Sequence, residues 1–283
     1  MSSPVTVPVF RAPAGVRKLA ERLGFALLAI VVVMALFGWW LAPYDPLATE
    51  PLSALQPPSW AHPFGTDSLG RDVFSRTLAA ARVDLMVAIV AVLASLTVGA
   101  LLGAAAGWAG GWADRLVGRI IDTIMAFPLF VLAVGIAAAM GNSLSSVILA
   151  TAIVNLPFYV RQTRTEVNRR RNAAYVEAAR LAGFSPVAIV GLHIMPNLAA
   201  PLAVQSSLNM GWAILNAAGL SFIGLGIRPP TPEWGILVSD GATYIFSGEW
   251  WLFVCPGAVL MMAVLAFGLV GDALRDRLDP RRP

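Results

Sequence analysis

The sequence predicts an all-α fold, a polytopic bundle of six transmembrane helices. Of its 283 residues, 58% are hydrophobic and only 13% are charged, whereas ordinary soluble domains are about 45–50% apolar and about 25% charged. Six stretches are apolar over the roughly 20 residues that a helix needs to cross the hydrocarbon core of a membrane. Lysine and arginine also gather in alternate connecting segments, which is typical of multi-pass membrane proteins.

The six predicted spans are residues 23–42, 84–106, 118–140, 147–164, 198–224 and 251–271. The first span is longer than the apolar core of about 7–15 residues in a secretory signal. It continues into Trp39, Trp40 and Pro43 rather than into a small-residue cleavage site, so we interpret it as an uncleaved anchor. The fourth span is the least regular, because Asn155 and Pro157 interrupt it.

The distribution of basic residues predicts the orientation. Of the 20 lysines and arginines, 16 fall in residues 1–22, 107–120, 161–185 and 272–283. Cytoplasmic segments of membrane proteins are enriched in these residues. We therefore expect both termini to be cytoplasmic. We assign the positive charge to the cytoplasmic face of the membrane protein rather than to nucleic acid binding.

Four units follow along the chain. Residues 1–22 and 273–283 are predicted to be cytoplasmic tails, residues 23–83 the first span with an external segment, and residues 84–272 the transmembrane core. Within the external segment, residues 66–81 are expected to form a helix in the outer interface. Its lipid-facing residues would be Leu69, Val73, Phe74 and Leu78, and its water-facing residues Arg71, Asp72 and Arg76.

The sequence offers no chemistry for catalysis. Cys255 is the single cysteine, which excludes a disulfide within the chain and makes a cysteine-based metal site implausible. GTDSLGRD at 65–72 has the glycine spacing of a phosphate-binding loop, but Arg71 and Asp72 stand where lysine and serine or threonine are needed. We expect no catalytic residue, no metal site and no cofactor in this chain.

Two helical patterns concern packing and transport. Ser95, Gly99, Gly103 and Gly107 recur every four residues and would let another helix approach closely, either as static packing or as a moving seam. Gln205, Asn209, Trp212 and Asn216 share one face of the fifth span. With Asn155 in the fourth span, these amides either bond to neighbouring helices or line a wet path for a solute.

The predicted path is uncharged. Asp84, Asp122 and Asp272 are expected near span ends. Ion-coupled carriers usually keep an ionisable residue inside the membrane. An uncharged path therefore favours a solute that moves because another component supplies the energy.

A charged segment between the fourth and fifth spans predicts two short helices joined by a bend. Ala173 to Leu181 favours a helix, and Gly183 stands where a left-handed cap would end it. Ser185 and Pro186 provide an N-cap and a first helical residue. This second helix is expected to end before Pro196.

An apolar face distinguishes the second helix from a solvated linker. Its members would be Val187, Ile189 and Val190. A helix this short needs packing to be stable. The segment therefore suggests a knob that docks onto a soluble partner.

The same segment resembles the EAA loop of ABC importer permeases. The matching residues are Glu177, Ala178, Ala179, Gly183, Ile194 and Pro196, with Met195 in place of the usual leucine. Three further stretches resemble the peptide and nickel branch of these permeases: GTDSLGRDVFSR at 65–76, LSFIGLGIRPPTPEWG at 220–235 and GDALRDRLDPR at 271–281. Within that branch, the C-type subunit is the nearest match.

This resemblance implies a type I ABC importer permease fold in the bacterial inner membrane. The loop at 170–197 would couple to the ATPases through the matching residues together with Ser185 and Pro186. The implied partners are a paralogous permease in a heterodimer, two ATPases that bind ATP and Mg, an extracytoplasmic substrate-binding protein and membrane lipid. The chain itself would hydrolyse nothing.

Two other classes remain as alternatives, an ion-coupled secondary transporter and a membrane scaffold without a transport role. The sequence does not identify the transported solute. Dipeptides, oligopeptides, nickel chelates, glutathione-like thiols and some glycosides all move through similar permeases.

Overall fold

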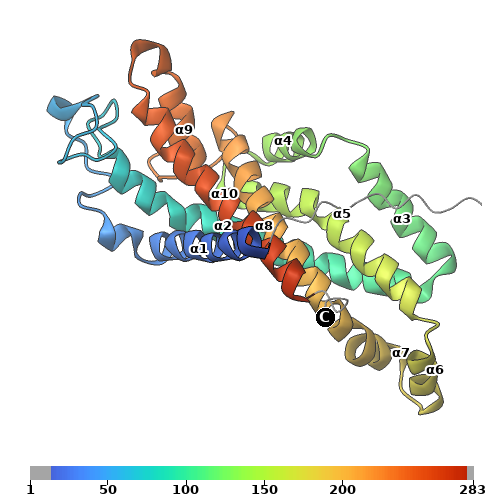
Figure 1. The fold of residues 1–283 in the computed structure, drawn as a ribbon. Coiled ribbons are helices and arrows are strands. Elements are labelled where there is room, and N and C mark those ends of the chain that lie inside the picture. Colours follow the sequence, from blue (N-terminus) through green and yellow to red (C-terminus); the bar gives the residue numbers. More distant parts are fainter. Residues whose placement is uncertain (1–13, 279–283) are drawn as a thin grey trace, which may run out of the picture.

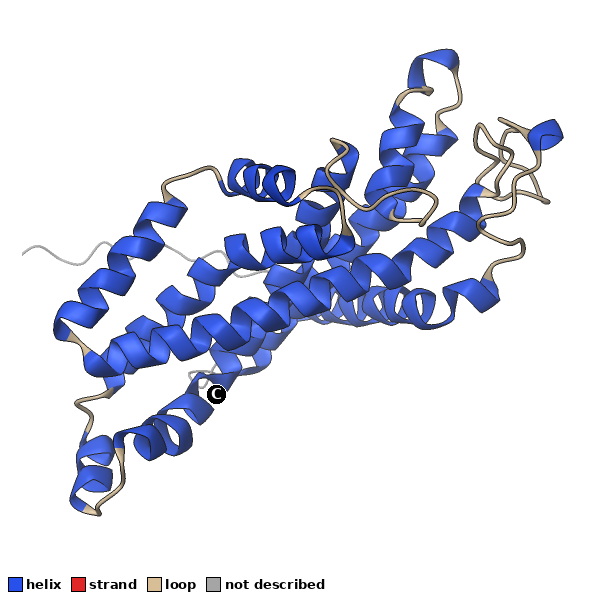
Figure 2. Ribbon diagram, turned by 180° about the vertical axis from the view of Figure 1, so that it is seen from behind, coloured by secondary structure: helices blue, strands red, loops and turns tan. Residues whose placement is uncertain are grey.

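The computed structural model describes residues 14–278, and these residues form a helical bundle (Figure 1; Figure 2). The five longest helices are α1 (Ala14–Leu41), α2 (Val73–Ala109), α5 (Leu144–Arg170), α8 (Ala199–Phe222) and α10 (Trp251–Leu278). The shorter ones are α3 (Gly111–Met125), α4 (Leu129–Met140), α6 (Ala174–Leu181), α7 (Pro186–Ala188) and α9 (Trp234–Ala242). Within residues 14–278 no β-strand forms, and Thr66 and Asp72 make an isolated antiparallel β-bridge. The predicted all-α class is confirmed.

Among the described residues, 5 helices are long and apolar enough to cross a membrane, or up to 6 spans if α3 and α4 count as one. The prediction of one continuous helix over 118–140 is wrong, because α3 and α4 meet at an angle of 88°. Pro128 stands at the N-cap of α4. Proline lacks an N–H and disfavours helical backbone at the residue before it, so the chain turns here.

The second span begins earlier than expected, and no separate interfacial helix covers 66–81. Asp72 caps α2, because its side chain accepts a hydrogen bond of 2.7 Å from the Ser75 N–H. The helix then runs from Val73 to Ala109 without a break. Arg76 and Asp72, predicted to face water, are 1% and 3% exposed. The predicted interfacial helix is therefore wrong.

The two ends of the described chain lie together. Arg17 of α1 lies 3.8 Å from Asp276 of α10, and Glu21 pairs with Arg277. Residues 14–22 and 273–278 of the predicted tails are therefore helical extensions of the bundle. The rest of those tails lies outside the described residues. Both ends face the part of the bundle that carries α6 and α7 (Figure 1).

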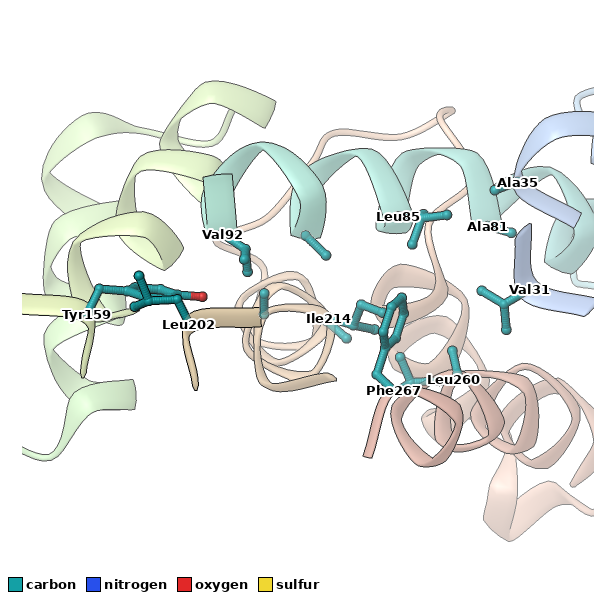
Figure 3. Packing of buried hydrophobic residues seen from close by; sticks show 14 of the residues in the cluster. Val31, Ala35, Ala81, Leu85, Val92, Tyr159, Leu202, Ile214, Leu260 and Phe267 are labelled. Atoms are coloured by element: carbon teal, nitrogen blue, oxygen red, sulfur yellow. The ribbon is translucent and has the colours of Figure 1, made fainter. Parts of the chain in front are cut away.

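A shared hydrophobic core holds the long helices together (Figure 3). Val31 and Ala35 of α1 meet Ala81 and Leu85 of α2 (Figure 3). Val92 of α2, Tyr159 of α5, Leu202 and Ile214 of α8, and Leu260 and Phe267 of α10 extend the same core. One continuous apolar cluster therefore joins five helices.

The most extensive helix contact joins α2 to α5 through the predicted stripe of small residues. A Cβ added at Gly103 would lie 2.6 Å from the Val160 carbonyl oxygen, and one at Gly107 would lie 2.6 Å from the Arg164 carbonyl oxygen. Ser95 Oγ donates a hydrogen bond of 2.7 Å to the Ala152 carbonyl. The predicted close approach of a second helix is confirmed.

We expect Gly103→Leu to destabilise the protein by about 1–3 kcal/mol, because a side chain there collides with the backbone of α5. Gly268→Leu on α10 is the matched control, since a Cβ at Gly268 meets nothing within 4 Å. Thermal unfolding of the purified protein in detergent measures the difference. Equal melting temperatures for both variants would contradict the assigned role of the α2–α5 contact.

Candidate coupling segment and cavities

The bend after α6 has the hydrogen bonds of a Schellman cap. The Phe184 N–H donates to the Ala179 carbonyl at 3.1 Å, and the Gly183 N–H donates to the Arg180 carbonyl at 3.0 Å. Gly183 has φ +84, in the left-handed region that glycine adopts without a steric penalty. The predicted glycine cap is confirmed.

The second helix starts as predicted and ends differently. Ser185 caps α7 by accepting a hydrogen bond of 3.3 Å from the Ala188 N–H. The chain then continues through a π-helix at Ile189–Ile194 and a 3-10 helix at Met195–Leu198 directly into α8. The predicted end before Pro196 is wrong. A widened turn, in which the Met195 N–H bonds to the Val190 carbonyl, accommodates the proline without ending the helical path.

Contacts at both sides hold the segment against the bundle. The Arg180 guanidinium lies 5.0 Å from the centre of the Trp108 ring at the end of α2, and it donates a hydrogen bond of 3.1 Å to the Arg171 carbonyl. Val176 and Ile194 are completely buried. Cation–π contacts and buried apolar side chains order the segment, so it is not a solvated linker.

The outer face of the segment is exposed and largely apolar. Leu181 is 91% exposed and Val187 is 83% exposed, whereas Ile189 is buried, so the predicted apolar face of Val187, Ile189 and Val190 is divided between the surface and the core. Glu177 and Ala178 are exposed, whereas Ala179 is buried. Figure 1 shows α6 and α7 projecting from one end of the bundle.

The Glu177 side chain has no hydrogen bond or ion pair with any residue of the described range. Capping of the loop's own backbone by this carboxylate is therefore not observed. A free carboxylate beside exposed leucine and valine side chains fits a surface that another protein covers.

Asn155 and Asn216 lie in the wall of one cavity, and their role in a solute path stays a prediction. The cavity measures about 370 Å³ and is lined also by Phe130, Phe158, Trp212 and Leu215. No charged side chain is among the described residues that line it. The Asn155 amide also donates a hydrogen bond of 2.9 Å to the Thr151 carbonyl, which fixes its orientation.

Gln205 and Asn209 lie elsewhere on α8. The Gln205 amide donates a hydrogen bond of 2.9 Å to Asn209 Oδ1, and Asn209 is only 2% exposed. Gln205 lines a second cavity of about 400 Å³, together with Glu166, Arg170 and Arg275. The predicted stripe is thus divided between two cavities, with Asn209 in the packed region between them.

Sequence reasoning missed a buried pair of carboxyl groups. Asp84 is completely buried inside α2, where its Oδ2 accepts a hydrogen bond of 3.1 Å from the Trp234 N–H. Asp84 lies well inside α2 rather than at its first turn. Its carboxyl group holds α9 against α2 and does not line the cavity of Asn155 and Asn216.

Glu233, the other member of this pair, is 1% exposed and caps α9. Its carboxylate accepts hydrogen bonds of 2.9 Å from the Gly235 and Ile236 N–H groups. Burial raises the pKa of Glu233 because a charged carboxylate is poorly solvated there. Glu is not among the preferred N-cap residues, which are Ser, Thr, Asp, Asn and Gly, so the sequence offered little signal for this cap.

Comparison with known proteins gives consistent matches. Residues 99–282 match the family model of the binding-protein-dependent transport system inner membrane component. Residues 20–58 match the N-terminal TM domain of oligopeptide transport permease C.

Relatives are similar over most of their length. The dipeptide transport system permease protein DppC of Escherichia coli (strain K12) is 44% identical over 91% of this chain and 88% of the relative. The di/tripeptide transport system permease protein DppC of Pseudomonas aeruginosa (strain UCBPP-PA14) is 43% identical over 91% and 87%. The probable D,D-dipeptide transport system permease protein DdpC of Escherichia coli (strain K12) is 42% identical over 90% and 85%. The chain therefore belongs to the family of binding-protein-dependent transport system inner membrane components, and it is a permease of an ABC transporter rather than an enzyme.

Proposed function

We propose that this chain forms, with a paralogous permease, the translocation path of an ATP-driven importer of dipeptides or similar short peptides. The relatives named above carry dipeptide or di/tripeptide in their names. The observation that carries the proposal is the projecting, rigidly held segment of α6 and α7 with its exposed apolar face. Two ATPases that bind ATP and Mg would supply the energy through this segment.

The coupling residues are Glu177, Ala178, Ala179, Gly183, Ser185, Pro186, Ile194 and Pro196. Glu177 and Ala178 are exposed for contact with an ATPase, whereas Ile194 anchors the segment in the core. Because the helical path from Pro186 to Phe222 is continuous, a displacement of the segment moves α8. Trp212 and Asn216 of α8 line the uncharged cavity, so that wall would move with it.

The polar residues of α8 would mark the route of the solute. It would pass from the cavity of Asn155 and Asn216, beside Asn209, to the cavity of Gln205. The second cavity lies where α5 and α10 end, among Arg170, Arg275 and Leu278. This end would be cytoplasmic, with both termini on the same side, and the opposite end would receive peptide from the extracytoplasmic binding protein.

Co-purification tests the assembly. A tagged chain that is expressed together with its partner subunits should retain a paralogous permease and two ATPases. In proteoliposomes, the complex should transport dipeptide only when ATP is present on the side of the membrane that carries the ATPases. Accumulation driven by an ion gradient without ATPases would identify a secondary transporter. A chain that purifies with no transport activity and no ATPase would identify a scaffold.

We expect Gly183→Val to uncouple transport from ATP hydrolysis. A β-branched residue at φ +84 is strained by about 1–3 kcal/mol, so the bend changes while the membrane helices stay intact. Gly183→Asn is the matched control, because asparagine adopts left-handed backbone more readily. Dipeptide uptake and ATPase co-purification are the measurements, and wild-type values of both for Gly183→Val would contradict the role of the bend.

We expect Asn216→Leu to lower dipeptide uptake by roughly fivefold, the effect of losing about one hydrogen bond to a solute. ATPase binding should stay unchanged, because Asn216 lies far along α8 from the coupling segment. Leu215→Met, a change in the same cavity wall that conserves volume, should leave uptake near the wild-type value. Unchanged uptake with Asn216→Leu would make this amide a packing residue.

A further inference from the structure

A groove between α1 and α2 on the outside of the bundle contains a single charged residue. Its volume is about 350 Å³, and its lining includes Leu36, Trp40, Arg82, Met86, Ile89 and Val90. The two helices lie side by side in both views (Figure 1; Figure 2). Leu36 and Trp40 are 63% and 80% exposed, so the groove opens away from the protein core.

Arg82 has no protein partner within residues 14–278. Its side chain is exposed, and it makes no hydrogen bond or ion pair there. Arg71 and Arg76, which precede it in the sequence, both pair with Asp67. The nearby Asp84 is completely buried and bonds to Trp234 instead. A guanidinium in an apolar groove therefore lacks the anion that would compensate it.

The depth of Arg82 matches the membrane interface. Trp39 and Trp40 stand at the end of α1, as interfacial tryptophans do. Gly38 packs directly on the backbone of Leu78, since a Cβ there would collide with the Leu78 carbonyl. Arg82 follows Leu78 by one helical turn on the same face.

The direction of the Arg82 side chain brings its charge still closer to the headgroups. Helical side chains tilt toward the helix N-terminus, which for α2 is the end beside Trp40. Long arginine side chains extend in this way to place their charge at the interface. We therefore expect the guanidinium and Trp40 to lie at the depth of lipid phosphates.

We propose that this groove binds one anionic glycerophospholipid of the outer leaflet. The Arg82 guanidinium would donate two hydrogen bonds to the phosphate, a geometry that suits arginine. An acyl chain would lie along Leu36, Met86, Ile89 and Val90, and the Trp40 ring would pack at headgroup level. This site is separate from the peptide path and does not depend on the transport function proposed above.

Native mass spectrometry of the intact transporter tests the site. The complex is reconstituted in nanodiscs of phosphatidylcholine with a minor fraction of phosphatidylglycerol, then released in detergent, and the retained lipids are counted. Arg82→Gln should lower phosphatidylglycerol retention by about tenfold, the effect of losing a charge-assisted hydrogen bond. Arg228→Gln removes another exposed arginine, from the loop after α8, and should retain lipid like the wild type.

A second variant keeps the test decisive if Arg82→Gln fails to accumulate. Met86→Trp fills the groove and leaves Arg82 in place, so it should also lower retention of phosphatidylglycerol. Equal retention in the wild type and Met86→Trp would overturn the proposal. Retention of phosphatidylcholine as strong as that of phosphatidylglycerol, or a cryo-EM map in which the paralogous permease fills the groove, would overturn it as well.

Discussion

The close backbone contact between α2 and α5 is the constraint on which the rest of the arrangement depends. Without side chains at Gly99, Gly103 and Gly107, the two helices approach until carbonyl oxygens of α5 occupy the space of the missing Cβ atoms. Gly107 is followed by Trp108, which receives Arg180. The helix contact therefore fixes the position of the Trp108 ring, and through it the position of the segment that contains α6 and α7.

Features that depend on neighbouring residues were predictable from the sequence. The Gly183 cap, the Ser185 N-cap and the small-residue stripe each follow from local chemistry, because the backbone conformation or spacing needs those residue types. Prolines were harder to interpret. Pro128 accompanies a sharp turn, Pro157 lies inside α5, and Pro196 lies in the 3-10 helix that follows a π-helix. Whether a proline breaks a helix depends on packing that the local sequence does not contain.

Features that depend on distant partners were not predictable. Arg76 looked like a water-facing residue of an interfacial helix, but Asp67 compensates its charge in the buried setting. The sequence around Asp84 does not indicate that its carboxyl group accepts a hydrogen bond from the N-terminus of α9. In the candidate site, the coupling residues were predicted through a family resemblance, and their role stays a prediction. The grouping of Asn155 with Asn216, apart from Gln205, required the three-dimensional arrangement of α5 and α8.

The bond between Asp84 and Trp234 has a consequence for how the protein is made. Its two residues are 150 positions apart, so α2 leaves the ribosome long before α9 exists. Until then, Asp84 is a carboxyl group without its amide partner, and such groups are costly in lipid. The hydrogen bond between α2 and α9 can therefore form only after α9 has been synthesised, so this contact belongs to the late steps in assembly of the bundle.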